Sequence, residues 1–414
     1  MTQTQPLQTL KGFRDFLPEE KRARDFVVQK IKTVFETFGF QPIETPTLEY
    51  ASLLLGKYGE EADKLVYTFE DRGDRKIGLR YDQTVPSARV LTQYQDKLPK
   101  YFRRYQIQNV FRADKPQKGR FREFTQCDID IFGSTSPLSD AEIMACTYQA
   151  FKAIGFKNIV LRFNDRETLI KTLQPFTNEQ VNVFSLIQSI DKLDKIKPED
   201  VVAELVKKGL EKSKAEEALT SIKNAEKSVN LSNIEQNVYS LGIPKEALEF
   251  SPILARGLDY YTGMIFEIII PEYPVGSCGG GGRYDQLIRD LGGPNMPATG
   301  VAFGFDRIVE AATALELIPI NQGVEVLVAN FDKNTLTETL LATQQLRKLG
   351  VKTELYPETD KLGKQFKYAD QNKMPYVLIV GEEEAKNKTV SIKNMKTGNQ
   401  TTISLEKIAN FRSI

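Results

Sequence analysis

One stretch of the sequence, FRADKPQKGRFREFTQCDIDIFG from Phe111 to Gly133, concentrates side chains that could handle phosphate. It contains three arginines, a basic loop interrupted by Pro and Gly, and alternating strand positions Gln126, Asp128 and Asp130. An arginine guanidinium binds phosphate oxygens with fixed geometry, so a strand-borne Arg112 could hold a nucleotide phosphate. An exposed hairpin with cross-strand ion pairs would explain the same residues. The stretch alone leaves both interpretations open.

Two further peptides carry unusual residue combinations. In LARGLDYYTG, Leu254 to Gly263, a core strand would explain the tyrosines but not an Arg followed by Gly, Asp and paired Tyr. In GVAFGFDRI, Gly300 to Ile308, small residues run into an Asp-Arg pair, as in many strands that pass into a helix. The first peptide therefore favours a binding function, and the second is weak evidence taken alone.

The absence of one residue type excludes whole mechanisms. The chain has no histidine, so a His general base, a Ser-His-Asp triad and a His-ligated metal are impossible. Cys127, Cys146 and Cys278 are too widely spaced to indicate a disulfide framework or a zinc cluster. This cysteine usage favours a reducing cytoplasm.

Composition is that of a globular protein with more than one domain. A chain of 414 residues predicts two or three domains, and 41% hydrophobic residues suffice for large cores. Lys plus Arg total 56 against 55 Asp plus Glu, so any nucleic-acid partner must meet local patches. The N-terminus has no apolar signal region, and no long apolar run predicts a membrane span.

Hydrophobic spacing predicts the elements that would position these residues. Within the segment from Lys21 to Phe40, apolar residues at helical intervals predict a helix that stops at Gly39 and is followed by an extended segment. The region from Lys64 to Gly133 reads as strand-rich, an antiparallel sheet with one long hairpin loop. Residues Ser139 to Phe156 predict a helix with Ser139 as its N-cap and Gly155 near its end.

Changes of texture along the chain predict its division into domains. Residues 1–163 form the first part of a catalytic domain, and Lys/Glu/Leu/Ala-rich helices indicate a helical insertion over 164–250. Strand texture returns over 251–320, which completes the catalytic domain. Residues 321–414 alternate as β-α-β-α-β and predict a separate α/β domain.

Three peptides together resemble the motifs of class II aminoacyl-tRNA synthetases. GFQPIETPTLE resembles motif 1 and GVAFGFDRI resembles motif 3, and both stand in the family's order around motif 2. The motif 2 pattern is filled by Phe111, Arg112, Gly119, Arg120 and Phe124, with Asp114 where Glu is usual. The resemblance implies an α+β fold, with an antiparallel-sheet catalytic domain, a helical insertion and a C-terminal α/β anticodon-binding domain.

LARGLDYYTG further resembles a peptide of histidyl-tRNA synthetases, and LRYDQTVPSARV, Leu79 to Val90, resembles the eukaryotic-type version of that family. The resemblance implies that Asp82 and Gln126 hold the α-ammonium of histidine, with Gln83 and Thr84 beside them. It also implies that Asp130 and Tyr261 bind the imidazole ring, with Tyr260 and Tyr284 close by. Apart from the resemblance, core packing would explain Tyr284 equally well.

The same resemblance implies a site for ATP. Phe124 would stack on adenine with Arg307 over its other face, and Glu123 belongs to the same ATP-binding set. Arg112 and Arg256 would meet the α-phosphate, with Arg256 as the principal catalytic residue and Mg²⁺ sharing the charge. The sequence identifies no metal ligands. A carboxylate is already ionised at pH 7, so its attack on phosphorus needs no general base.

For tRNA(His), the C-terminal domain resembles anticodon-binding domains and offers Lys361, Lys364, Lys367 and Lys373 near helical spacing. A solvated basic helix face would explain these lysines as well. The loop from Asp114 to Gly119, with Lys115, Gln117 and Lys118, is a candidate for contact with the acceptor stem. The motif 1 resemblance implies a homodimer.

Three other functions would fit parts of the same sequence. A non-catalytic relative that regulates histidine biosynthesis would typically have degraded LARGLDYYTG and lost the C-terminal domain, yet both are present. A class II synthetase for another amino acid is disfavoured by that peptide and by the Asp82, Gln126 and Asp130 set. A synthetase-like module of a kinase is disfavoured because no kinase sequence is present.

One residue departs from the family pattern. Many members of the family carry His or Tyr at the position of Thr125.

Overall fold

In the computed structural model the chain forms two compact units, Met1–Ile318 and Pro319–Ile414. No described helix combines the length and apolar content needed to cross a bilayer. The described residues are 7–56, 63–116, 120–194, 196–255, 260–274, 276–319 and 323–413.

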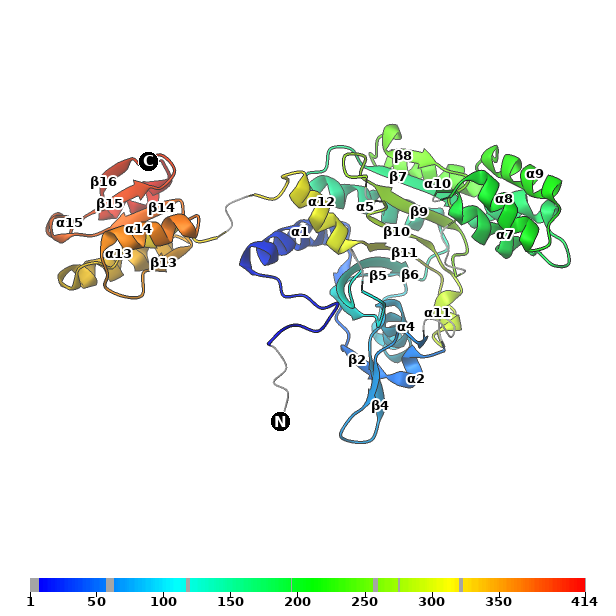
Figure 1. Ribbon diagram of the computed structural model, residues 1–414, viewed down its shortest axis with the longest axis horizontal. Coiled ribbons are helices and arrows are strands. Elements are labelled where there is room, and N and C mark those ends of the chain that lie inside the picture. The colour runs from blue at the N-terminus through cyan, green and yellow to red at the C-terminus, as the bar shows by residue number, and fades with distance from the viewer. Residues whose placement is uncertain are drawn as a thin grey trace. The chain divides into compact units, whose positions relative to one another are not determined.

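The first unit is built on an eight-stranded sheet in the order β1-β5-β6-β11-β10-β9-β7-β8 (Figure 1). Its neighbours run antiparallel except for the β1–β5 and β7–β8 pairs. The antiparallel sheet predicted from strand texture is thereby confirmed. Its strands are β1 Gln41–Pro42, β5 Phe102–Phe111, β6 Glu123–Phe132, β7 Val160–Asp165, β8 Leu248–Phe250, β9 Met264–Ile269, β10 Gly279–Arg283 and β11 Ala298–Phe303.

A long first helix leads into this sheet. Helix α1, Pro18–Thr37, begins with proline in its first turn, where the missing N–H costs no hydrogen bond. It buries Val27, Ile31 and Phe35 completely. Gly39 then takes φ +76°, a left-handed conformation that ends the helix and favours glycine. The predicted helix and its stop are confirmed.

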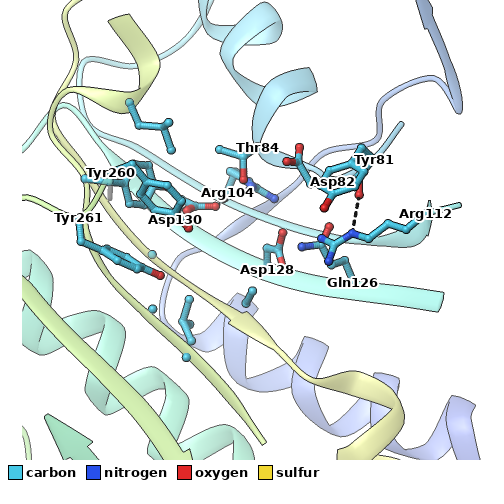
Figure 2. A pocket seen from close by; sticks show the side chains of 17 residues that line it. Tyr81, Asp82, Thr84, Arg104, Arg112, Gln126, Asp128, Asp130, Tyr260 and Tyr261 are labelled. Carbon is cyan, nitrogen blue, oxygen red and sulfur yellow. Dashed lines mark hydrogen bonds and ion pairs between the residues drawn. The ribbon is translucent and has the colours of Figure 1, made fainter. Parts of the chain in front are cut away.

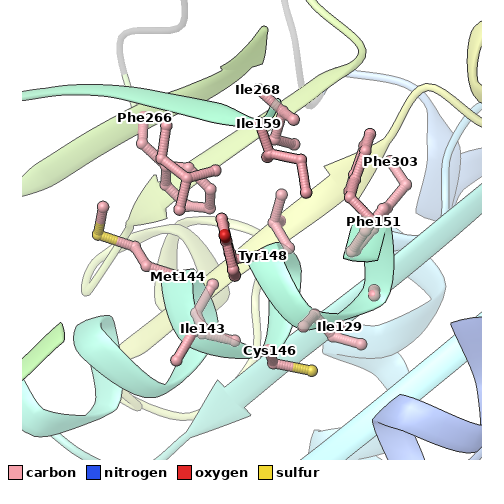
Figure 3. Close-up of a cluster of buried hydrophobic side chains, with 14 of the residues drawn as sticks. Ile129, Ile143, Met144, Cys146, Tyr148, Phe151, Ile159, Phe266, Ile268 and Phe303 are labelled. Carbon is pink, nitrogen blue, oxygen red and sulfur yellow. The ribbon is translucent and has the colours of Figure 1, made fainter. Parts of the chain in front are cut away.

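One apolar layer covers a single face of the sheet. Helix α5, Pro137–Ile154, packs with α1 and α12, Phe305–Ala314, on that face (Figure 1), and Figure 3 shows Phe151 beside Phe303 of β11. The predicted N-cap of α5 was wrong: the Ser136 side chain accepts from Leu138 N, whereas Ser139 is buried and bonds to Ser134. Gly155 ends the helix as predicted, with φ +118°.

A helix lies within the region that was predicted to be strand-rich. Helix α4, Thr84–Gln93, interrupts the strand-rich region. Pro86 weakens the helical pattern in the sequence, but it falls in the first turn, where proline is tolerated. The neighbouring β2 Leu48–Tyr50, β3 Thr68–Glu70 and β4 Lys76–Leu79 form a separate three-stranded sheet, and α2 Ala51–Leu54 and α11 Leu287–Asp290 are short helices.

Five helices follow β7, and they belong to two hydrophobic cores. Residues of the first four pack in one cluster, whereas the fifth packs against α5 in the cluster beneath the large sheet. Strand β8, which was also predicted to lie within the insertion, pairs with β7 at the edge of that sheet. The helices are α6 Arg166–Leu173, α7 Val183–Ile190, α8 Pro198–Lys207, α9 Lys212–Lys223 and α10 Val229–Ser240.

The second unit contains the predicted β-α-β-α-β alternation. Its sheet has the order β13-β12-β14-β15-β16, in which the first three strands are parallel and the last two add an antiparallel hairpin. Its elements are β12 Val326–Val328, α13 Leu336–Lys348, β13 Thr353–Leu355, α14 Leu362–Gln371, β14 Tyr376–Ile379, α15 Glu382–Asn387, β15 Thr389–Asn394 and β16 Gln400–Ser404.

Candidate active site

Strand β6 separates the apolar core from a polar face. Successive side chains of a strand point to opposite faces, so Cys127, Ile129 and Ile131 enter the core. Gln126 and Asp128 alternate with them and line the cavity on the opposite face, together with Asp130. The three candidate positions of the sequence are therefore brought onto one surface.

Asp130 is held in place by two buried partners. Arg104, directly opposite on β5, lies 2.6 Å from Asp130 Oδ2, and the Tyr284 hydroxyl donates to Oδ1. Arg104 is 1% exposed, and Asp130 is 5% exposed. Burial raises the pKa of Asp130, and the charge of Arg104 opposes that rise. Tyr284 is therefore both a packed core residue and a hydrogen-bond donor within the site.

Gly300 of β11 leaves the space that Asp130 occupies. A Cβ atom at position 300 would lie 1.9 Å from Asp130 Oδ1 and 2.6 Å from the Ile129 carbonyl oxygen. The small residue in this peptide is thus required by the carboxylate beside it.

We expect Gly300→Ala to destabilise the first unit by about 1–3 kcal/mol, because Asp130 must move. Thermal unfolding measures the loss. Gly363→Ala is the matched control, since a Cβ at Gly363 meets nothing within 4 Å. A Gly300→Ala protein with unchanged stability would show that position 300 accepts a side chain without displacing Asp130.

The polar face opens into a cavity of about 420 Å³. Tyr260 and Tyr261 lie at one end with ring centroids 4.6 Å apart, and Tyr260 meets Tyr284 edge-on at 6.0 Å. Figure 2 shows Tyr260 and Tyr261 beside Asp130, with Asp82 and Arg112 towards the other end. The described part of LARGLDYYTG and the hairpin that begins at Phe111 therefore meet in one cavity.

Of the three predicted residues at the start of α4, two line this cavity and the third does not. Asp82 and Thr84 line it, and Asp82 Oδ1 also accepts from the Val85 backbone N–H at 3.0 Å. Gln83 is fully buried away from the cavity lining. Its amide donates to the carbonyl oxygens of Gln108 and Gln126. Gln83 therefore ties α4 to strands β5 and β6 rather than facing a ligand.

A second cavity of about 390 Å³ adjoins the first. The two share Arg112, Gln126, Gly280 and Ala302 as lining residues. Phe124 and Arg307 line the second cavity, and Arg307 donates to the Ser277 carbonyl oxygen at 2.7 Å. A ligand that spans both cavities must pass Arg112.

Arg112 is fixed at this junction by its surroundings. Its Nε donates to the Tyr81 carbonyl oxygen at 3.2 Å, and its guanidinium carbon lies 4.4 Å from the Tyr81 ring centroid and 5.1 Å from that of Phe124. These contacts hold the side chain while leaving most of its N–H donors for a ligand.

The remaining predicted site residues either line neither cavity or lie outside the described part of the chain. Glu123 accepts from the Asn109 side chain at 2.9 Å and lines neither cavity. Arg256 lies outside the described residues, as do Gln117, Lys118 and Gly119 of the hairpin loop. Among the described residues, no group of three or more acidic or cysteine side chains could hold a metal ion.

The sequence interpretation missed a polar network behind the second cavity. Arg24 of α1 pairs with Asp306 of α12, and its Nη2 donates to Thr125 Oγ1 at 2.9 Å. Thr125 in turn donates to Asn109 Oδ1 at 2.9 Å. The residue that departs from the family pattern therefore joins motif 2 to α1. Arg104 was also missed, although its place opposite an acidic strand position was a usable signal.

A mostly antiparallel sheet that carries two joined cavities on one face has the architecture of a class II aminoacyl-tRNA synthetase catalytic domain. The family model of histidyl-tRNA synthetase matches residues 12–308, and that of the anticodon binding domain matches residues 317–412. The chain belongs to the histidyl-tRNA synthetase family.

Individual relatives agree over nearly the whole length. The chain is 38% identical to a histidine–tRNA ligase of Christiangramia forsetii, over 95% of this chain and 96% of the relative. It is also 38% identical to one of Cytophaga hutchinsonii, over 96% and 97%. The crystal structure of histidyl-tRNA synthetase from Nostoc sp. PCC 7120 superposes with a TM-score of 0.87 at 30% identity, covering 99% of both chains.

Proposed function

We propose that this protein activates L-histidine with ATP to form histidyl-adenylate and transfers the histidyl group to the 3′ end of tRNA(His). The observation that carries the proposal is the pair of adjoining cavities with Arg112 at their junction. One cavity offers aromatic rings and carboxylates suited to an imidazole and an ammonium. The other offers Phe124 and cationic side chains suited to a nucleotide.

In the amino-acid cavity, we assign the imidazole to Asp130 and the tyrosines. A carboxylate accepts an imidazole N–H, while Tyr260 and Tyr261 pack against the ring. Burial raises the pKa of Tyr284 well above its ordinary value, so its hydroxyl remains a donor that orients Asp130. A site that pairs the ring nitrogens rejects analogues that leave its buried polar groups unpaired.

The histidine carboxylate then points towards the junction and Arg112. It is ionised at neutral pH and attacks the α-phosphorus directly, so no proton need be removed. Pyrophosphate leaves as the new acyl–phosphate bond forms. Arg112 stabilises the negative charge that develops on the phosphoryl oxygens, with Arg256 assigned the same role by its family position.

In the nucleotide cavity, we assign the adenine to Phe124 and Arg307. The aromatic ring offers a stacking surface, and an arginine over a purine contributes cation–π attraction. Mg²⁺ is proposed only as a companion of the ATP phosphates, since it is commonly held through them and one or two carboxylates.

The second unit offers a surface for tRNA. Lys361, Lys364, Lys367 and Lys373 are all exposed on or next to α14, although Lys364 also pairs with Asp360 at 2.8 Å. Such cations suit contact with phosphates. Lys115, at the described edge of the hairpin loop, remains a candidate for contact with the acceptor stem.

We also propose that the protein is a homodimer and that it acts in the cytoplasm. The proposed domains are a catalytic domain in two parts, 1–163 and 251–320, a helical insertion over 164–250 and an anticodon-binding domain over 321–414.

Pyrophosphate exchange with each of the twenty amino acids tests the function. We expect exchange with histidine alone, because only its side chain satisfies Asp130 and the surrounding tyrosines together. Exchange with another amino acid would favour a synthetase of different specificity. A pure protein that exchanges with none would favour the non-catalytic regulator.

A further inference from the structure

We propose that Asp128 supplies the counter-charge for the α-ammonium group of histidine, a role that rests on the proposed function and adds to Asp82 and Gln126. The family resemblance assigned no role to this residue.

Asp128 is a buried carboxylate that faces the ligand space. It lines the 420 Å³ cavity and is 4% exposed. Its Oδ1 is buried and has no hydrogen-bond partner among the described residues. A buried acceptor without a partner is costly, so a ligand that donates to it gains binding energy.

The neighbouring carboxylates already have protein partners. Asp130 is engaged by Arg104 and by the Tyr284 hydroxyl, and Asp82 caps the first turn of α4. Arg104 is thus committed to Asp130 at 2.6 Å. Of the three carboxylates in this cavity, Asp128 is therefore the one most available to pair with a cationic group of the ligand.

The charge balance of the cavity favours a cationic ligand group. Among the described residues, its lining contains three carboxylates, Asp82, Asp128 and Asp130, against two guanidiniums, Arg104 and Arg112. The surplus is therefore one negative charge, which one ammonium would neutralise. A buried charge is stable only when it is paired, so the ammonium and Asp128 stabilise each other.

A second buried hydrogen-bond acceptor without a described partner lies beside Asp128. The Oε1 atom of Gln126 is buried and has no hydrogen-bond partner in the described part of the chain. The two side chains are two residues apart on the same face of β6, and Figure 2 shows Asp128 between Gln126 and Asp130, with Asp82 across from them. An ammonium has three N–H donors, enough for Gln126, Asp128 and Asp82.

Protonation of the free site follows from this surplus charge. Burial raises the pKa of Asp128 to about 8; Asp130 and Asp82 also raise it, whereas Arg104 and Arg112 lower it. Its strand neighbours Gln106 and Ala302 carry no charge. Below pH 8 the free carboxyl is mostly protonated and must lose its proton when an ammonium binds. Affinity for histidine should therefore rise with pH up to about 8.

The test compares the protein with Asp128→Asn, which keeps the side-chain shape and removes the charge. We expect the KM for histidine in pyrophosphate exchange to rise about 10- to 100-fold, because a charged hydrogen bond is lost. The KM for ATP should stay within about twofold, because the nucleotide cavity is untouched. Asp290→Asn is the matched control: it removes one exposed carboxylate from α11, and we expect both constants to remain unchanged.

A second measurement uses the unaltered protein and L-histidinol, which has the ammonium and imidazole but no carboxylate. Between pH 7 and 8.5 its affinity should rise with pH, and calorimetry in buffers of different ionisation heat should show release of about one proton at pH 7. Asp128→Asn should abolish both effects. An unchanged histidine KM in the variant would overturn the role of Asp128. Absence of histidine exchange by the unaltered protein would instead count against the proposed function.

Discussion

Replacement of Arg112 by alanine is expected to lower kcat/KM for histidyl-adenylate formation by about 10²- to 10³-fold, because a fixed donor to the transition-state charge is lost. The guanidinium stands where the two cavities join and is held by Tyr81 and Phe124. It therefore needs little rearrangement when charge develops. Stopped-flow or single-turnover adenylate formation measures the loss directly.

Two comparison variants sharpen this prediction. Arg112→Lys keeps the charge but loses the planar fork, so it should recover only part of the rate. Arg289→Ala removes an exposed arginine that pairs with Asp290 on α11, and the rate should not change. If Arg112→Ala raises only the KM for ATP and leaves kcat intact, Arg112 binds the ground state and does not stabilise the transition state.

The second large effect is expected on stability. Arg104→Met should destabilise the first unit by about 3–5 kcal/mol at pH 8, because it leaves the Asp130 carboxylate buried without its cation. The ion pair is 2.6 Å long and both side chains are almost completely buried. Denaturant unfolding of the full chain, followed by a probe in the first unit, measures the loss.

The pH dependence of this loss has a definite sign. Without Arg104, burial raises the pKa of Asp130 further above its unfolded value. A carboxyl whose pKa is raised on folding stabilises the protein at low pH and loses that contribution as pH rises through the folded pKa. Arg104→Met should therefore lose less stability at pH 5 than at pH 8, and Arg104→Met with Asp130→Asn should lose less than Arg104→Met alone at pH 8. Equal losses at both pH values would contradict the buried-charge explanation.

The fold was predictable where a local signal agreed with tertiary packing. Apolar spacing predicted α1, glycine predicted its end at Gly39, and strand alternation predicted the long hairpin of β5 and β6. Helix α4 was missed because Pro86 reads as a helix breaker, and only the observed start at Thr84 places it in a tolerated first-turn position. The N-cap of α5 was predicted three residues too late. The segment holds several serines, and only the backbone conformation shows that the side chain of Ser136 caps the helix.

The site was predictable to the extent that a motif contains it. Resemblance led to Asp82, Gln126 and Asp130, which line one cavity. The burial of Gln83 could not be predicted, because its partners Gln108 and Gln126 belong to strands far along the chain. The charge balance of the site could not be predicted either, because it depends on the register of the β5–β6 pairing. In this register Arg104 lies opposite Asp130, whereas Asp128 lies opposite the neutral Gln106.

Histidine and ATP are proposed to occupy adjoining cavities and to meet at Arg112. A crystal structure with a sulfamoyl analogue of histidyl-adenylate tests it most directly. We predict the imidazole against Asp130 and Tyr261, the adenine on Phe124, and the sulfamoyl oxygens within hydrogen-bond distance of Arg112, roughly 2.7–3.2 Å. An analogue bound with its adenine among the tyrosines, or with its sulfamoyl group away from Arg112, would contradict the account.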